Sequence, residues 1–192
     1  MHNIYILLTR SPSIVSRAIS YSTGDDYTHS SLAYDDKLYT LCSFARRYTR
    51  LPLPGGLVRE KLEGGFYEIH KDIPCALLSL CVSESVYRSI CEKVDGMLLH
   101  RKDFHYDVRG LILCRMGRES KRDNHYFCSR FVGEVLLESG AVQALPKPAS
   151  LMHPQDFLDL DEVTVVYEGL LSGLVKPVRK GLFPQKHIQS AI

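Results

Sequence analysis

The chain has 192 residues, 45% of them hydrophobic and 24% charged, which is the composition of one globular domain large enough to bury its own core. The formal net charge is +2 and basic residues are spread along the sequence, so the charge gives no reason to expect a nucleic-acid partner or an acidic membrane surface. No apolar run approaches the roughly 20 residues that span a bilayer. The N-terminus has no basic leader, so we expect no signal peptide, no integral membrane segment and a cytoplasmic location.

The first quarter of the chain predicts strands with one early helix. Residues 3–8 are apolar and rich in β-formers, which predicts a buried strand, and residues 11–22 have the apolar spacing of a helix. Two short strands, 27–34 and 38–44, flank a pair of aspartates that favours a turn. We therefore expect these two strands to pair as a hairpin.

The rest of the chain alternates between strands and helices. A long connection at 45–65, rich in proline and glycine, is expected to wall a pocket. We then expect strands near 57–59, at 66–70, 76–82 and 163–167, and helices from 83 or 85 to 98, at 108–116 and at 128–139. This pattern predicts an α+β domain over residues 1–174, built on an antiparallel sheet or barrel, followed by a flexible basic tail at 175–192.

Cys128 is the strongest candidate for chemistry among the six cysteines. It lies in HYFCSRFVGEVLLESG, at the expected first turn of a helix, where unpaired backbone N–H groups and the helix dipole favour a thiolate. A free cysteine is also commonly a small buried hydrophobe, so the pattern leaves an inert role open. Cys75, Cys81, Cys91 and Cys114 lie within strand or helix patterns and look structural. No two cysteines have the close spacing of zinc ligands, so we predict no metal and no cofactor.

His29 is the preferred base among the eight histidines, because it begins a strand, YTHSSLAY, that can hold its imidazole in place. A Cys–His pair usually needs a third group that orients the imidazole. A three-residue turn in the hairpin places Ser43 opposite His29, whereas a two-residue turn places Cys42 there with Thr40 as a diagonal neighbour. We take Ser43 as the third residue, with Thr40 and Cys42 as the alternatives.

Three segments together resemble a family of cysteine hydrolases. These are IYILLTRSPSIVSRAISYSTGDDYTH, the histidine block YTHSSLAYDDKLYTLCSF and the cysteine block HYFCSRFVGEVLLESGA. They are similar to the permuted branch of the papain-like NlpC/P60 superfamily, which includes YiiX/YaeF-like proteins and lecithin:retinol acyltransferase-like enzymes. Papain-like enzymes place the cysteine before the histidine, whereas His29 precedes Cys128, which is the permuted order. The resemblance covers residues 3–140.

The resemblance implies a permuted papain-like fold and hydrolysis of an amide bond through an acyl-enzyme on Cys128, with His29 as base. The implied substrate is a small-molecule, peptide or lipid-derived amide, including a fragment of peptidoglycan. Acyl transfer or thioester cleavage on a lipid by the same pair is the second hypothesis, and an inert binding module of the same fold is the third. The family commonly has His, Glu, Asn or Gln in the third position, and the hairpin offers none of these.

Overall fold

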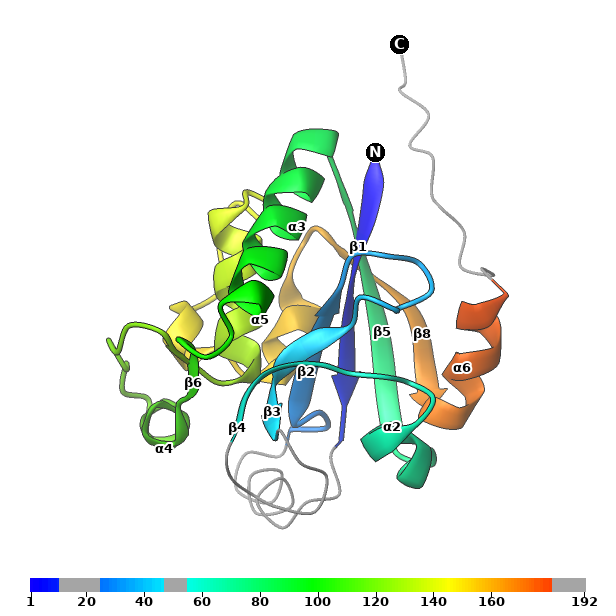
Figure 1. Ribbon diagram of the computed structural model, residues 1–192, viewed down its shortest axis with the longest axis horizontal. Coiled ribbons are helices and arrows are strands. Elements are labelled where there is room, and N and C mark those ends of the chain that lie inside the picture. The colour runs from blue at the N-terminus through cyan, green and yellow to red at the C-terminus, as the bar shows by residue number, and fades with distance from the viewer. Residues whose placement is uncertain (11–24, 47–54, 181–192) are drawn as a thin grey trace.

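The described part of the chain is organised around a six-stranded antiparallel sheet (Figure 1). The computed structural model describes residues 1–10, 25–46 and 55–180. The strands lie in the order β4-β3-β2-β1-β5-β8. In chain order they are β1 (His2–Thr9), β2 (His29–Ala33), β3 (Cys42–Arg46), β4 (Gly55–Arg59), β5 (Pro74–Val82) and β8 (Val163–Leu170).

Helices flank this sheet, and a short parallel pair of strands lies beside it. The α-helices are α2 (Gly65–Ile69), α3 (Glu84–Leu99), α4 (Val108–Arg115), α5 (Cys128–Glu138) and α6 (Leu171–Arg179). The parallel pair is β6 (His105–Tyr106) with β7 (His125–Tyr126), and two 3-10 helices, η1 (Ala149–Leu151) and η2 (Pro154–Asp159), precede β8. Figure 1 shows α3 and α5 on one side of the sheet and α6 on the other.

The side chains of β1 alternate between two hydrophobic layers, as a central strand requires. Ile4, Ile6 and Leu8 are fully buried in the layer that contains the apolar faces of α3 and α5. Tyr5 and Leu7 are buried in the opposite layer, which α2 and α6 cover. Because both faces of β1 are covered, its sequence is nearly continuous in apolar residues.

Several elements form as the sequence predicts. The hydroxyl of Ser83 accepts a hydrogen bond from the backbone N–H of Val86 and so begins α3, one of the two predicted starts. Helix α5 begins at Cys128, and Gly140 follows it with φ 76°, a conformation that glycine adopts without strain. Strands β1, β5 and β8 also lie where they were expected.

The hairpin of β2 and β3 has a wider turn and a different register than predicted. The carboxylate of Asp35 accepts hydrogen bonds from the backbone N–H groups of Lys37 and Thr40, which organises the loop between the strands. Leu32 therefore pairs with Cys42, and the continued register sets residue 43 opposite residue 31. Ser43 is not the cross-strand neighbour of His29, and neither predicted turn length is correct.

Two other predicted segments differ from the structure. Residues 66–70 were expected to form a strand, but α2 is helical, because Gly64 and Gly65 have φ of 92° and 66° and turn the chain out of strand geometry. Helix α6 continues through the predicted boundary at residue 174, because Val178 is buried in the core, so the expected flexible tail is helical as far as Arg179. The helix predicted at 11–22 lies outside the described residues.

The fold class is confirmed as α+β with an antiparallel sheet. Over residues 1–10, 25–46 and 55–180 the sheet is open, with β4 and β8 as its outer strands, and does not close into a barrel. Among the helices of this part of the chain, none combines the length and the apolar character that crossing a bilayer requires.

Candidate active site

Cys128 is the first residue of α5 and is 7% exposed. Phe127 precedes it in an extended conformation, and no side chain caps the helix. The backbone N–H groups of Ser30 and Ser129 donate hydrogen bonds to the Cys128 sulfur. Burial opposes ionisation of this thiol, but the hydrogen bond and charge of His29 and these two N–H groups outweigh it, so the pKa of Cys128 is lowered.

His29 begins β2 and is the direct partner of Cys128. Its side chain is 16% exposed, and its Nε2 lies 3.0 Å from Oε1 of Glu60. Burial by itself favours the neutral imidazole. The negative charge of Glu60 and the hydrogen bond to Cys128 act more strongly in the other direction, and they raise the pKa of His29 to about 10. The imidazole is therefore a strong proton acceptor beside a thiol that gives up its proton readily.

Glu60 is the group that holds the imidazole, and the sequence analysis did not single it out. It follows β4, its backbone N–H donates to the carbonyl of Leu41 at 2.8 Å, and its side chain is 12% exposed. While Oε1 faces His29, Oε2 accepts a hydrogen bond from the Ser31 hydroxyl and lies 3.4 Å from the Tyr67 hydroxyl. Burial raises the pKa of a carboxyl, but the charge of His29 and these hydrogen bonds outweigh burial, so the pKa of Glu60 is lowered.

The three residues considered for the third role lie elsewhere in the network. Ser43 is fully buried and lies near enough to Glu60 to help lower its pKa, but within residues 1–10, 25–46 and 55–180 its hydroxyl makes no hydrogen bond. Thr40 bonds to Asp35 and to the backbone N–H of Tyr34. Cys42 is completely buried, its thiol donates to the carbonyl of Leu32, and burial raises its pKa well above the ordinary value.

Sequence patterns gave little sign of Glu60. It stands in a charged run, Arg59-Glu60-Lys61, which is typical of a solvated loop. One signal was present, because Glu60 directly follows the strand expected near 57–59. That signal acquires meaning only in the folded chain, where the Glu60 backbone bonds to Leu41 and the Glu60 side chain reaches His29.

A second partly buried histidine, His153, lies near the start of α5. The Ser129 hydroxyl donates to the carbonyl of Met152 at 2.5 Å, which fixes the segment that contains His153 against the helix. His153 Nδ1 lies 3.1 Å from Oδ2 of Asp25, and Arg115 Nη1 lies 3.3 Å from the same oxygen. Burial and the positive charge of Arg115 lower the pKa of His153.

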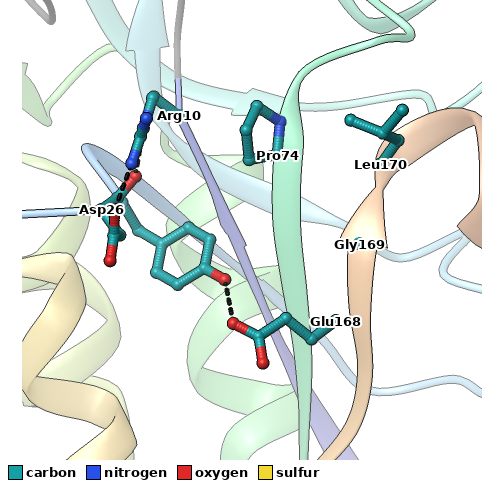
Figure 2. Close-up of a pocket in the computed structure, with 7 residues that line it drawn as sticks. Arg10, Asp26, Pro74, Glu168, Gly169 and Leu170 are labelled. Carbon is teal, nitrogen blue, oxygen red and sulfur yellow. Dashed lines mark hydrogen bonds and ion pairs between the residues drawn. The ribbon is translucent and has the colours of Figure 1, made fainter.

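A surface cavity of about 370 Å³ opens where β1, β5 and β8 meet (Figure 2). The Arg10 guanidinium pairs with Asp26, as a dashed line in Figure 2 shows. The Tyr27 hydroxyl donates to Glu168 at 2.9 Å. Arg10 follows Thr9, the strand partner of His29. The cavity therefore lies at the same end of the strands as the cysteine–histidine pair. Neither Cys128 nor His29 lines it.

Within the part of the chain that the structure describes, no group of three or more His, Cys, Asp or Glu side chains has the arrangement of a metal site. Comparison with known proteins gives no match, either to a family model or to a curated protein.

Proposed function

We propose that the protein is a cysteine hydrolase in which Cys128 is the nucleophile, His29 is the base and Glu60 orients the imidazole. The observation that carries this proposal is the hydrogen bond of 3.0 Å between His29 Nε2 and Glu60 Oε1, beside a Cys128 thiol that lies close enough for the thiol and the imidazole to shift each other's pKa. A thiol with a lowered pKa, a paired imidazole and an acceptor on the far ring nitrogen are the parts that activate a cysteine. The open sheet, the nucleophile helix packed on it and the order of His29 and Cys128 support a permuted papain-like fold.

The proposed reaction begins with a thiolate–imidazolium pair. The thiolate attacks the carbonyl carbon of an amide, and the oxyanion that forms accepts hydrogen bonds from free backbone N–H groups at the first turn of α5, including that of Cys128. His29 donates its proton to the amine nitrogen as the carbon–nitrogen bond breaks, which leaves a thioester on Cys128. His29 then removes a proton from water, and the resulting hydroxide attacks the thioester carbonyl. The carbon–sulfur bond breaks, which releases the acid and restores the thiolate.

Glu60 has two roles in this cycle. Glu60 Oε1 is hydrogen-bonded to His29 Nε2, so Nδ1 is the ring nitrogen that exchanges protons with Cys128. The same hydrogen bond fixes the tautomer of the imidazole. The carboxylate also stabilises the imidazolium, which the hydroxyl of Ser43 cannot do. The hairpin sequence offers none of the residue types that the family commonly has in the third position. Glu60, which lies outside the hairpin, is one of those types.

The proposed substrate is an amide of a small molecule, a peptide or a peptidoglycan-derived fragment. The inert binding module predicts an ordinary or raised pKa for Cys128, so the lowered pKa weighs against it. The other buried cysteines differ in this respect, because burial raises the pKa of Cys42, Cys75 and Cys114. Only at Cys128, among the cysteines for which the pKa is shifted, does the surrounding structure favour the thiolate.

The test is the rate of alkylation by iodoacetamide for each cysteine across pH, followed by mass spectrometry, in the wild type and in His29→Ala. We expect Cys128 to react fastest well below pH 8.5, the ordinary thiol pKa, and to lose this advantage in the variant. A nitrophenyl ester then tests acylation, since a burst of nitrophenolate equal to the enzyme concentration requires a covalent acyl-enzyme. If Cys128 reacts no faster than Cys81, the exposed cysteine, the proposal fails.

A further inference from the structure

Helix α4 presents an apolar stripe to solvent. Val108, Ile112 and the capping residue Met116 are 44%, 57% and 62% exposed. They are spaced four residues apart, so they lie along one side of the helix. Most exposed apolar residues on a protein surface are scattered singly, whereas an exposed apolar line on one helix is typical of a contact surface.

The exposure of this stripe does not result from a loosely held helix. The carboxylate of Asp107, which is fully buried, accepts hydrogen bonds from the backbone N–H of Gly110 and from the Ser120 hydroxyl, and it pairs with Arg122. A Cβ at Gly110 would lie 2.1 Å from Asp107 Oδ2, so this capping arrangement requires glycine. On the opposite side of α4, Cys114 is buried. The helix is therefore fixed with its apolar stripe outward.

Basic residues surround the stripe. Between residues 100 and 123, six Lys and Arg residues are exposed against three Asp and Glu residues. Arg109 lies on α4 beside the stripe, and Arg118 and Lys121 follow the helix. No ion pair to Arg109, Arg118 or Lys121 is formed by the side chains that the structure describes. An apolar stripe with cationic neighbours matches the interface of an anionic membrane, which takes up apolar side chains below negative headgroups.

The stripe also lies close to the candidate active site along the backbone. The N–H of Asp107, the residue that caps α4, donates at 2.8 Å to the carbonyl of Tyr126, two residues before Cys128. Figure 1 shows α4 at a corner of the molecule, outside the layer formed by α3 and α5. A surface in contact with α4 therefore lies beside the segment that leads into the nucleophile helix.

We propose that α4 docks the protein onto anionic lipid surfaces, with Ile112 and Met116 entering the interface and Arg109, Arg118 and Lys121 binding headgroup phosphates or carboxylates. The inference goes beyond the proposed hydrolase and does not depend on it, because the docking residues are distinct from Cys128, His29 and Glu60.

The chain contains no tryptophan, so one introduced indole reports its own environment alone. Ile112→Trp is the probe. Val165→Trp is the control, because Val165 is 47% exposed on the outer strand β8. Each variant is mixed with vesicles of phosphatidylcholine and phosphatidylserine, or of phosphatidylcholine alone, with and without brominated acyl chains. We expect blue-shifted, bromine-quenched emission only for Ile112→Trp on the anionic vesicles.

Charge reversal provides a second measurement. Arg109→Glu with Arg118→Glu, in the Ile112→Trp background, should weaken binding to the anionic vesicles by about tenfold or more. Cys128→Ser should bind like the parent, which separates docking from catalysis. Emission that does not respond to anionic vesicles overturns the proposal. An equal response in Val165→Trp, or a blue shift that depends on protein concentration without lipid, also overturns it, the latter in favour of contact between two copies.

Discussion

The protein has two partly buried histidine–carboxylate pairs with nearly the same distance between the ring nitrogen and the carboxylate oxygen, but with opposite electrostatics. His29 lies 3.0 Å from Glu60, and His153 lies 3.1 Å from Asp25. The pKa of His29 is raised and that of His153 is lowered. The geometry of the pair does not explain this difference, so its cause lies in the other neighbours of each carboxylate.

Those neighbours are hydroxyls in one pair and a cation in the other. Glu60 is bonded by Ser31 and faced by Tyr67, which leave its negative charge available to an imidazolium. Asp25 already neutralises Arg115, whose positive charge also repels a proton from His153. The Cys128 thiol lies beside His29 and also raises the pKa of its imidazole. A His–carboxylate pair is thus a candidate base when no cation shares the carboxylate and a nucleophile faces the ring.

Removing each imidazole tests this contrast with the largest expected effect. His29→Ala should lower the rate of Cys128 acylation on the order of 10⁴-fold, because the thiol loses both its proton acceptor and its counter-ion. His153→Ala should leave that rate close to the wild-type value. Burst kinetics with the nitrophenyl ester measure both, and thermal unfolding shows whether each variant is folded. Equal losses in two folded variants would remove the distinction between the pairs.

Removing each carboxylate charge should give the next largest effect. Glu60→Gln keeps the shape of the side chain but no longer stabilises the imidazolium, so the rate should fall on the order of 10²-fold. Asp25→Asn is the matched change in the other pair and should have little effect. Ser43→Ala tests the residue that the sequence favoured, and it should change the rate far less than Glu60→Gln. A larger loss in Ser43→Ala than in Glu60→Gln would return the third role to the hairpin.

The contrast between Glu60 and Ser43 shows how far the sequence leads. Cys128 and His29 each occupy the end of an element, and such ends can be predicted from capping and strand patterns. Their partner depends on a register, and a loop organised by one side chain, Asp35, moved that register beyond either predicted turn. Glu60 follows β4 and reaches His29 on β2 past the one strand between them, β3, and the pairing of these strands is not encoded in local periodicity. Local patterns thus indicate the candidate pair, whereas the proposed third residue emerges only from tertiary structure.

The two pairs should also respond to pH in opposite directions. The pKa of His29 is raised from 6.5 to about 10, so its contribution to the free energy of unfolding is fully present below pH 6.5 and is lost as the pH rises toward 10. The pKa of His153 is lowered from 6.5, so its contribution is present above pH 6.5 and is lost as the pH falls through the lowered value.

Urea unfolding across pH measures these contributions. The destabilisation caused by His29→Asn should be largest in mild acid, and that caused by His153→Asn should be largest at alkaline pH. NMR titration of the imidazole carbon-bound protons assigns each pKa directly. If the two destabilisations vary with pH in the same direction, the opposite electrostatics of the pairs are wrong.

Two adjacent serines of β2 provide the finest test of why Glu60 differs from Asp25. The Ser31 hydroxyl donates to the Glu60 carboxylate, whereas the buried Ser30 hydroxyl has no hydrogen-bond partner within residues 1–10, 25–46 and 55–180. Ser31→Ala should lower the acylation rate by about three- to tenfold, as the loss of one hydrogen bond predicts.

Because that bond also lowers the pKa of Glu60, the acid limb of the pH–rate profile should move to higher pH. Ser30→Ala keeps the backbone N–H that donates to Cys128 and should leave the profile in place. A rate loss in Ser31→Ala without movement of the acid limb would mean that Ser31 acts through packing or through its contact with His29 Nε2 at 3.3 Å, and not by tuning the charge of Glu60.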